Sequence, residues 1–395
     1  MYTRIKWKIF KIFNFKNITI LVLIFLTLIY SKLKPSKILI IQNQFKASEN
    51  KLTSQPLPQL YIKPSVTKKA IILVAFHRTG SSFTGELLNI HPDVFYLYEP
   101  LKLITDGCHR KEEERIGLIE NIIGCKIPGP EASINPLLTQ TSLRNDIIFR
   151  TKSQRLCSAE FCNGYNASSN PFACSKCPKV DLDQASLVCR NLIPGIKLIR
   201  LCEIDLIQRM IFSNPGVDFK LPVLVRDPRG IFQSRHKIFK EKMDSKQLVK
   251  NVKWTCRSMF QIADAIKYRP ELKNKIKIFR YEDISRDPLK GALKFYKFVN
   301  LPMTDAIHQK IITMTTSSSQ NKLHSNSSYS TSKDSKHQFQ DWRNGIDLDS
   351  VKMIQEDPDC KKSMNEFGYK SVYDDEVLRD LEHELVEGKV NTLNF

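Results

Sequence analysis

The sequence predicts an α/β protein, a parallel sheet flanked by helices, preceded by an N-terminal transmembrane helix. Short apolar runs alternate with longer amphipathic segments over most of the chain, as in strand–helix–strand units, and two of the runs end in cationic, glycine-containing turns. We expect strands at 70–76, 94–97, 195–201, 221–226 and 275–281. We expect helices at 82–90, 203–213, 229–240, 247–268, 288–299 and 376–388.

The two cationic turns have the composition of anion-binding sites. The apolar run Ala70–Phe76 ends in His77-Arg-Thr-Gly-Ser-Ser-Phe83, and the run Leu221–Val225 ends in Arg226-Asp-Pro-Arg-Gly-Ile-Phe-Gln-Ser234. Each is a buried strand leading into a polar turn and a helix, and the N–H groups of a helix N-terminus bind phosphate and sulfate. Two such turns suggest a ligand that carries an anionic group at each end.

The first turn departs from a standard P-loop. Gly80 and Gly85 have the required spacing, but Glu86 stands where that motif needs a lysine. A nucleotide kinase is therefore disfavoured. For this stretch taken alone, an ordinary strand–turn–helix with a serine N-cap is the alternative.

Further motifs follow in a set order along the chain. They are Arg78-Thr-Gly-Ser-Ser-Phe83, His91-Pro-Asp-Val-Phe-Tyr-Leu-Tyr-Glu-Pro100, Leu224-Val-Arg-Asp-Pro-Arg229, Arg280-Tyr-Glu-Asp-Ile284, Trp342-Arg343, and Cys360 ahead of Phe367-Gly-Tyr369. Over roughly residues 70–375 this order resembles the Golgi carbohydrate 6-O-sulfotransferases. The resemblance implies a P-loop-like sulfotransferase fold. It also implies transfer of a sulfuryl group from 3′-phosphoadenosine 5′-phosphosulfate (PAPS) to the 6-hydroxyl of galactose, N-acetylglucosamine or N-acetylgalactosamine.

The same resemblance implies where the donor binds. The first turn matches the 5′-phosphosulfate loop, and the second matches the 3′-phosphate site. The implied donor-binding residues are His77, Arg78, Thr79, Gly80, Ser81, Ser82, Phe83, Arg226, Asp227, Pro228, Arg229, Gly230, Ile231, Phe232, Gln233 and Ser234. Arginine and N–H groups take the role that magnesium has in kinases, so no metal is expected.

The catalytic candidates are Arg78, Glu99 and Lys197. Arg78 would neutralise the leaving phosphate, and Glu99, just after the second strand, resembles the catalytic glutamate of other Golgi polysaccharide sulfotransferases. The alternative for Glu99 is a structural carboxylate paired with a lysine or arginine. Lys197 and Arg200 are secondary candidates for contact with the acceptor or the sulfuryl group. His77 departs from the family, which often has an aromatic residue there.

Several other motif residues are interpreted as structural. Glu282 and Asp283 close a strand that we place away from both phosphate turns. Trp342 is interpreted as core packing rather than as a donor or sugar contact. Arg229 has two open roles, added charge at the donor or simple pairing with Asp227.

The N-terminal region predicts a type II membrane topology. Residues 1–17 form a basic cytoplasmic tail, 18–37 contain a signal anchor with its flank (about 12–31 in the wider assignment), and 38–69 form a stem. Residues 70–375 then form the luminal domain, and 376–395 a C-terminal helix and tail. We expect a single-pass protein of the Golgi membrane whose catalytic domain lies in the lumen.

Charge and cysteine content agree with that compartment. The net charge of +20 is spread along the chain and suits an anionic donor and an acidic glycan, whereas nucleic acid is not met in the lumen. All ten cysteines follow the anchor, so we expect disulfides, whose pairing the sequence leaves open.

Cys174-Ser-Lys-Cys177 alone is a weak zinc candidate. Asn166-Ala-Ser168 and Asn326-Ser-Ser328 are glycosylation acceptors if luminal.

Two rivals from other classes remain. A type II glycosyltransferase shares the topology, and Asp181-Leu-Asp183 and Asp347-Leu-Asp349 imitate its metal-binding motif, although neither follows a convincing strand. A sulfotransferase-like glycan-binding protein without turnover is the non-enzymatic rival. The acceptor sugar and the oligomeric state are not determined by this sequence.

Overall fold

The computed structural model describes residues 68–103, 112–127, 147–162, 174, 177–178, 180–201, 203–239, 244–316 and 339–388. All of them belong to the compact unit Pro64–Phe395. The predicted tail, anchor and most of the stem lie outside these residues, as do both glycosylation acceptors. Within the described ranges, no helix is long and apolar enough to cross a membrane.

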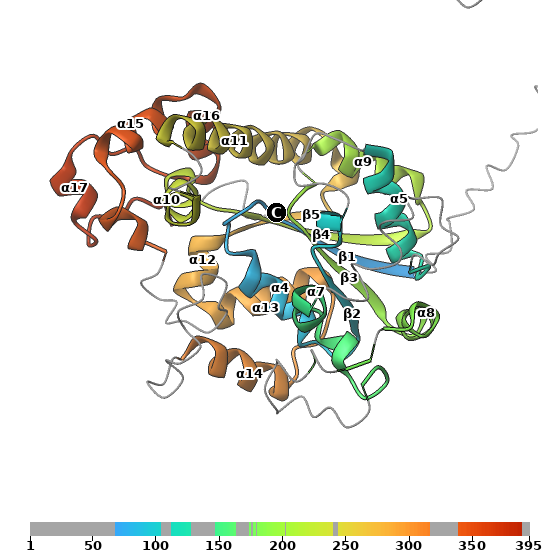
Figure 1. Ribbon diagram of the computed structural model, residues 1–395. Coiled ribbons are helices and arrows are strands. Elements are labelled where there is room, and N and C mark those ends of the chain that lie inside the picture. The colour runs from blue at the N-terminus through green and yellow to red at the C-terminus, as the bar shows by residue number, and fades with distance from the viewer. Residues whose placement is uncertain are drawn as a thin grey trace, which may run out of the picture. The chain divides into compact units, whose positions relative to one another are not determined.

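A five-stranded parallel sheet forms the centre of the domain (Figure 1). Its order is β2-β3-β1-β4-β5, and every neighbouring pair is parallel. The strands are β1 Lys68–Val74, β2 Val94–Tyr98, β3 Ile193–Leu198, β4 Val217–Val225 and β5 Ile276–Arg280. All five predicted strands are therefore confirmed, with boundaries that shift by a few residues. Continuous apolar runs suit strands that are covered on both faces.

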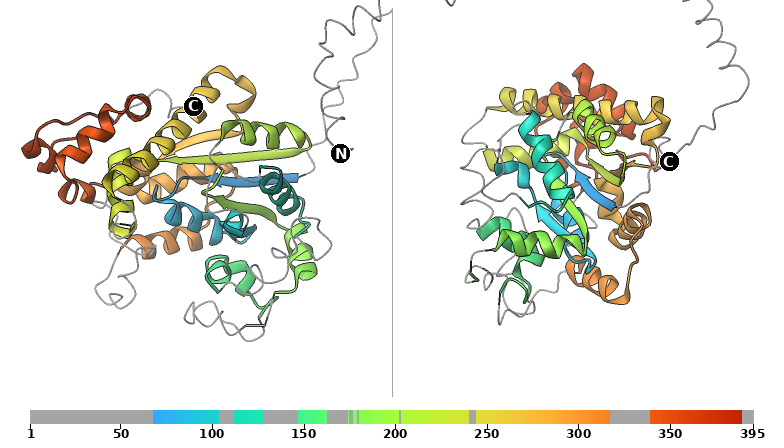
Figure 2. Two further views of the ribbon diagram at one scale, coloured as in Figure 1. Left: turned by 45° about the horizontal axis from the view of Figure 1, so that its top comes forward. Right: turned by 90° about the vertical axis from the view of Figure 1, so that its right-hand side faces the viewer.

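The two faces of the sheet bury separate cores because side chains alternate along a strand. In β1, Ile72 and Val74 face one core, while Ile71 and Leu73 face the other, and all four are fully buried. Helices α5, α9 and α11 cover the first face, and α4, α13 and α14 cover the second (Figures 1 and 2). The result is a three-layer domain whose strands all end at one edge.

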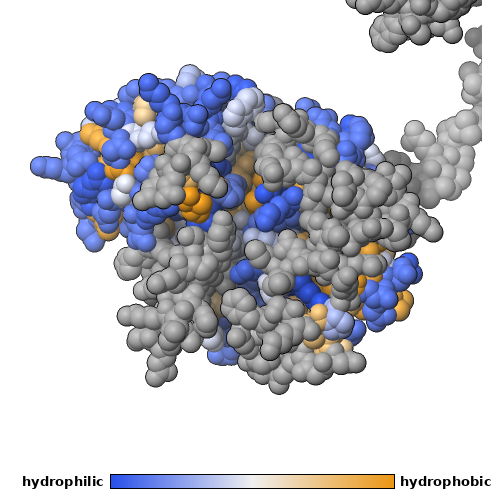
Figure 3. Space-filling view, viewed as in Figure 1, coloured by the Kyte–Doolittle hydropathy of each residue, from blue (hydrophilic) through white to orange (hydrophobic). Residues whose placement is uncertain are grey.

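The helices include all the predicted ones and several that the sequence did not reveal. Their bounds are α4 Ser81–Asn89, α5 Glu112–Ile123, α7 Ile147–Lys152, α8 Leu182–Arg190, α9 Ile204–Ser213, α10 Pro228–Phe239, α11 Ser245–Tyr268, α12 Tyr281–Arg286, α13 Pro288–Val299, α14 Asp305–Thr315, α15 Leu348–Glu356, α16 Pro358–Phe367 and α17 Asp375–Arg379. The surface over α15 and α17 is mainly hydrophilic (Figure 3), as expected for helices with one buried face.

The last predicted helix is much shorter than expected. It was expected over 376–388, but α17 ends at Arg379. The guanidinium of Arg343 donates to the carbonyls of Leu378 and His383, over 2.8 and 2.9 Å. In a continuing helix, these carbonyls would accept hydrogen bonds from backbone N–H groups four residues further along. Here they accept from the side chain of Arg343 instead. The chain continues to Val386, which forms an isolated antiparallel bridge with Tyr369.

Four disulfides connect the described cysteines. They are Cys125–Cys189, Cys157–Cys174, Cys162–Cys177 and Cys256–Cys360. Both members of the Cys-x-x-Cys pair are thus bonded to other cysteines, so the zinc interpretation of that pair is wrong. Cys108 and Cys202 lie outside the described residues.

The two Asp-x-Asp motifs serve as helix caps. Asp181 accepts hydrogen bonds from the backbone N–H groups of Asp183 and Gln184 at the start of α8. Asp347 accepts one from the N–H of Ser350 at the start of α15. An aspartate at an N-cap is explained by this role alone. Within the described residues, no group of three or more possible metal ligands is present.

Candidate active site

The carboxyl ends of the strands bring the predicted site residues to one edge. In spatial order, Glu99 follows β2, Arg200 follows β3, Arg78 follows β1, Arg226 follows β4 and Tyr281 follows β5. Four of these five side chains are cationic or anionic, and all five belong to loops or to the first residue of a helix. Ligands of open parallel sheets bind at such an edge.

Gly80 shapes the turn between β1 and α4. It is the N-cap of α4 with a φ of 87°, in the left-handed region, and no side chain caps the helix. A Cβ at Gly80 would lie 2.2 Å from Cδ2 of Tyr281. The serine N-cap that was the alternative for this stretch is therefore not formed. The first N–H groups of α4 are left with the geometry that binds an anion.

The hydroxyl of Thr79 belongs to the turn itself. Thr79 is fully buried, and its Oγ1 donates to the carbonyl of Phe76 over 2.8 Å and accepts from the N–H of Phe76 over 3.2 Å. Ser81, Ser82 and Phe83 occupy the first turn of α4. Thr79 therefore shapes the loop, while the serines lie at the helix N-terminus.

Arg78 connects the two predicted phosphate turns. Its Nε donates to Ser234 Oγ over 2.9 Å, and its carbonyl accepts from Arg226 Nη1 over 3.0 Å. Arg226 stacks on Tyr281, with Cζ 4.4 Å from the ring centroid. The Nε of Arg226 is buried and has no hydrogen-bond partner among the described residues. A buried unpaired donor beside an uncapped helix N-terminus fits an anionic ligand.

Two residues in this edge have strained backbones. Arg78 has a φ of 72° and Glu99 a φ of 46°, both in the region that favours glycine. Such conformations cost about 1–3 kcal/mol each and cluster at functional sites. The strain thus falls on two of the three residues that the sequence selects as catalytic candidates.

Arg235 of α10 holds the first turn from behind. It is buried, and its Nε and Nη2 donate to the carbonyl of His77 over 3.2 and 2.9 Å. Its other contacts are Thr255 Oγ1 and Asn251 of α11. Burial and then Arg78 lower its pKa to about 10, so it stays protonated at neutral pH. No motif in the sequence marked this residue, although it stands one position after the second motif.

His77 is neutral at physiological pH. Burial, followed by the nearby charges of Arg235 and Arg78, lowers its pKa to about 4. Its ring lies 5.6 Å from that of Phe239. A neutral, half-buried ring at this position takes the packing place of the aromatic residue expected from the resemblance.

Glu99 forms a buried charge cluster with two cations. Its Oε1 lies 2.9 Å from Lys197 Nζ, and its Oε2 lies 3.4 Å from Arg200 Nη1. Lys197 also lies 4.4 Å from the ring centroid of Tyr98. Burial alone would raise the pKa of Glu99, but Lys197 and Arg200 outweigh it and lower that pKa. The pairing of Glu99 with a lysine or arginine, which was the alternative considered from the sequence, is present. The role of Glu99 as the catalytic base stays a prediction.

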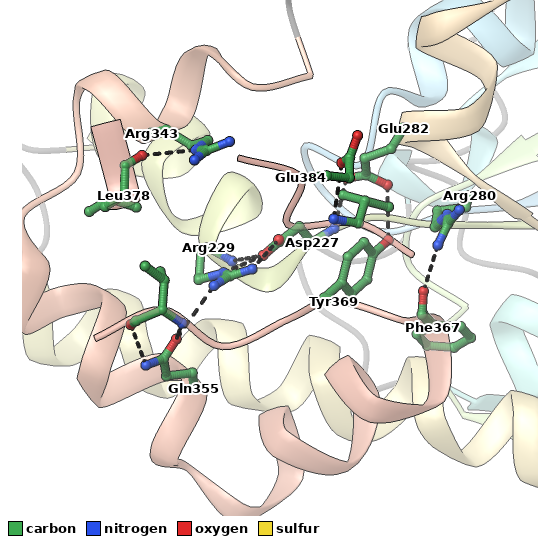
Figure 4. A network of polar contacts seen from close by, with 12 residues as sticks. Asp227, Arg229, Arg280, Glu282, Arg343, Gln355, Phe367, Tyr369, Leu378 and Glu384 are labelled. Atoms are coloured by element: carbon green, nitrogen blue, oxygen red, sulfur yellow. Dashed lines mark hydrogen bonds and ion pairs between the residues drawn. The ribbon is translucent and has the colours of Figure 1, made fainter. Parts of the chain in front are cut away.

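The second turn is folded around an internal ion pair. Arg229 is fully buried and contacts both carboxylate oxygens of Asp227, over 3.0 and 2.8 Å. Its Nη1 donates to Gln355 over 3.4 Å (Figure 4). Its Cζ lies 4.9 Å from the ring centroid of Trp342. Of the two roles left open for Arg229, pairing with Asp227 is the one formed. Trp342 packs in the core, as predicted.

Most remaining residues of the second motif shape α10. Pro228 begins the helix, and Ile231 and Phe232 are buried in the core. Gln233 Nε2 donates to the carbonyl of Gly345 over 2.6 Å. A Cβ on Gly230 would lie 3.2 Å from the Nε of Arg226, so glycine leaves room for that guanidinium. Arg226 and Ser234 are the motif side chains that lie next to the first turn.

Glu282 contacts the second turn, contrary to the sequence-based placement. Its Oε1 accepts from the N–H of Asp227 over 3.0 Å, and its Oε2 accepts from the hydroxyl of Tyr369 over 2.9 Å (Figure 4). The placement away from both turns was wrong because β5 lies beside β4. Burial and the charge of Asp227 raise the pKa of Glu282 to about 7. Asp283, by contrast, pairs with Arg280 over 2.7 Å.

Comparisons with known proteins find similarity to sulfotransferases. Residues 204–368 match the family of sulfotransferase domains. The chain is 29% identical over 348 residues to carbohydrate sulfotransferase 3 of Tetronarce californica, covering 82% of this chain and 77% of that protein. It is 28% identical over 360 residues to carbohydrate sulfotransferase 1 of Danio rerio, covering 82% and 83%.

Several solved structures are also similar, and one of them is given as an example. It is the sulfotransferase domain from the Synechococcus PCC 7002 olefin synthase, with a TM-score of 0.39 and 13% identity, covering 72% of this chain and 93% of that one. The fold and site define a parallel α/β protein with an anion-binding edge, and residues 204–368 are similar to sulfotransferase domains. The resemblance to carbohydrate sulfotransferases that the motifs indicate is confirmed by the sequence matches.

Proposed function

We propose that this protein transfers a sulfuryl group from PAPS to the 6-hydroxyl of an N-acetylglucosamine, galactose or N-acetylgalactosamine residue in a glycan or proteoglycan. The observation that carries the proposal is the meeting of both anion-binding turns at Arg78. Its side chain reaches Ser234 and its carbonyl reaches Arg226. A donor with a phosphate at each end of its nucleoside requires two such turns side by side.

The residues present fit that donor. The uncapped N–H groups of α4 and the guanidinium of Arg78 would hold the 5′-phosphosulfate. Arg226, with its unpaired Nε, and Ser234 would hold the 3′-phosphate. The donor supplies the activated sulfuryl group, and the protein supplies position and charge. Negative charge grows on the bridging oxygen during transfer, and Arg78 is placed to stabilise it.

Glu99 is the base in this proposal. The acceptor hydroxyl attacks sulfur in line with the leaving phosphate, so the acceptor lies on the side of the sulfuryl group away from that phosphate. Glu99 lies after β2, two strands away from the first turn, and can face that side. It is ionised at neutral pH because Lys197 and Arg200 hold its pKa below the ordinary value.

Lys197 can couple removal of the hydroxyl proton to departure of the phosphate. In the structure its ammonium is 2.9 Å from Glu99, which makes Glu99 a weak base. As negative charge develops on the donor, the ammonium is drawn toward it. The basicity of Glu99 then rises as the hydroxyl proton arrives, since a departing cation raises the pKa of a carboxylate. Lys197 thereby assists both proton removal and departure of the phosphate.

We also propose the location inferred from the N-terminal sequence. The basic residues before 18–37 and the apolar stretch itself support a single-pass anchor in the Golgi membrane, with the catalytic domain in the lumen. Four disulfides in the described residues are in keeping with an oxidising compartment. Protease protection of the full-length chain in sealed microsomes would test this topology.

The activity is tested with the purified full-length chain and PAPS carrying radiolabelled sulfate. The acceptor panel presents terminal or internal galactose, N-acetylglucosamine and N-acetylgalactosamine, with EDTA in half of the reactions. We expect label at a 6-hydroxyl in both halves. Donor binding without transfer to any acceptor would instead indicate a binding protein. Manganese-dependent transfer from a sugar nucleotide would indicate a glycosyltransferase.

A further inference from the structure

Glu282 joins the second turn to the C-terminal segment, defined here as residues 368–387. Its Oε1 accepts from the N–H of Asp227 over 3.0 Å, and its Oε2 accepts from the hydroxyl of Tyr369 over 2.9 Å (Figure 4). Glu282 is only 1% exposed. A tyrosine hydroxyl donates to a carboxylate and can accept from a protonated carboxyl. This site therefore holds Glu282 in either protonation state without a change of partners.

The C-terminal segment helps to seal Glu282 from solvent. Val386 forms an antiparallel bridge with Tyr369, and Nη2 of Arg280 donates to the carbonyl of Glu387 over 2.8 Å. A small cavity beside Glu282 is lined in part by Asp227, Glu384, Leu385 and Val386. Burial of this kind disfavours the charged form of a carboxyl.

The charged and titratable groups around Glu282 come from several elements. They are Arg226 and Asp227 of the second turn, Arg280 of β5, Asp283 of α12, Tyr369 after α16, and Arg343 and Glu384 at the cavity. Most of the charges are already used, in the ion pairs Asp227–Arg229, Arg280–Asp283 and Arg286–Glu384 and in the bonds from Arg343 to carbonyls. Arg226, by contrast, has a buried Nε without a partner among the described residues. Arg226 is therefore the cation whose electrostatic effect on Glu282 a ligand can change.

Arg226 and Glu282 act on each other electrostatically. Burial and then Asp227 raise the pKa of Glu282 to about 7, while Arg226 acts to lower it. In the proposed donor site, Arg226 also holds the 3′-phosphate. A phosphate on Arg226 offsets this cation and brings further negative charge, so it raises the pKa of Glu282. Because the coupling between two binding events is reciprocal, a proton on Glu282 must strengthen phosphate binding.

We propose that Glu282 is a positioning residue of the donor site, which takes up a proton from solvent as the 3′-phosphate binds. It holds the second turn through the N–H of Asp227, and its protonation removes a negative charge from beside that turn. Donor affinity is then highest when Glu282 is protonated, and it falls as pH rises through about 7. This inference rests on the proposed function, because it requires the 3′-phosphate to lie at Arg226.

Calorimetry with the full-length chain and two matched nucleotides tests it. One is adenosine 3′,5′-bisphosphate, the desulfated donor, and the other is adenosine 5′-phosphate, which lacks the 3′-phosphate. Glu282→Gln imitates the protonated side chain, so its affinity should not depend on this proton. For the bisphosphate, we expect the ratio of the wild-type Kd to the variant Kd to rise about fivefold from pH 6 to pH 8. For the 5′-phosphate, the ratio should stay constant. Taking a ratio cancels the titration of the nucleotide's own phosphates.

Two further measurements report the proton itself. At pH 7 about half of the free wild-type molecules carry it, so binding of the bisphosphate should take up about half a proton more in the wild type than in Glu282→Gln. Titrations in two buffers of different ionisation enthalpy count these protons. Tyr369→Phe removes a donor to the carboxylate, so its Kd should begin to rise at a higher pH than that of the wild type. This second variant keeps the test decisive if Glu282→Gln does not fold. Glu271→Gln, at an exposed glutamate before β5, is the control and should match the wild type.

The outcomes separate this inference from the proposed activity. If the bisphosphate Kd depends on pH through Glu282 but no acceptor is sulfated, the proposed activity fails and the proton uptake stands. Sulfation together with a constant Kd ratio, or with equal proton uptake in the wild type and Glu282→Gln, overturns the role of Glu282 alone. The same pH dependence for both nucleotides overturns it too, since the 3′-phosphate would not be the cause. Absence of binding of either nucleotide at every pH refutes both proposals.

Discussion

Arg78 and Ser234, separated by 156 positions in the sequence, are joined by a hydrogen bond of 2.9 Å from Nε to Oγ. Each belongs to a different cationic motif, one after β1 and one on α10. Since β1 and β4 are neighbours in the sheet, the bond joins the two turns into one surface. The same guanidinium therefore takes part in both halves of the proposed donor site.

Removing the guanidinium of Arg78 should abolish sulfuryl transfer while the fold persists. Arg78→Ala loses the charge that stabilises the leaving phosphate, and Arg78→Lys keeps a charge but loses the fork of donors. We expect sulfation to fall below detection in the first and by about 10²-fold in the second. Circular dichroism checks the fold. The control is Arg209→Ala, an exposed arginine paired with Glu113. Near-normal turnover in Arg78→Ala would make the site assignment wrong.

Glu99→Gln should separate catalysis from binding. An amide cannot accept the hydroxyl proton, so kcat should fall by about 10²- to 10⁴-fold. The donor is held by other residues, so its Kd, measured with the desulfated nucleotide, should change little. Glu203→Gln removes a carboxylate from another ion pair, with Arg115 at 3.2 Å, and is the control. Equal losses of kcat and donor affinity would show that Glu99 is structural.

Gly80→Ala should disable the donor site without unfolding the protein. The φ of 87° disfavours any side chain by about 1–2 kcal/mol, and the new Cβ would lie 2.2 Å from the Tyr281 ring. The turn must shift, which moves the N–H groups of α4. We expect loss of binding of the desulfated nucleotide in calorimetry. Gly388→Ala, whose Cβ meets nothing within 4 Å, should bind normally. Normal binding by both variants would remove the turn from the donor site.

Glu282 should make the protein less stable as pH rises. Its pKa in the folded state is raised to about 7, against an ordinary value of 4.5. Its favourable contribution is therefore fully present below about pH 4.5 and is lost as pH rises through about 7. Urea unfolding at about pH 5 and pH 8 should show a smaller pH-dependent loss of unfolding free energy in Glu282→Gln than in the wild type.

The difference between the wild type and Glu282→Gln isolates the effect of Glu282 on stability, because the other carboxylates titrate in both proteins. Each pKa unit corresponds to about 1.4 kcal/mol, so the difference should be measurable. Asp305→Asn, a change at the first residue of α14 away from the network, is the control and should leave the wild-type profile unchanged. Identical profiles for the wild type and Glu282→Gln would show that this carboxyl does not hold its proton in the folded state.

Local sequence signals predicted the elements that depend on local chemistry. The strands are continuous apolar runs because both faces of the sheet are covered, and all five were located from that pattern. Gly80 and the adjacent hydroxyls marked the first turn. By contrast, α17 ends early because Arg343, more than 30 residues upstream, binds its carbonyls, and no local pattern reveals such a contact.

The sequence by itself determined the sheet, the two cationic turns and the selection of Arg78, Glu99 and Lys197, because each depends on neighbouring residues and on the ends of strands. Only the tertiary structure decided what lies beside them. The order of strands placed β5 next to β4 and thus Glu282 under Asp227, and the folding of α10 placed Arg235 behind His77. These contacts join residues far apart in the chain, and only packing brings them together.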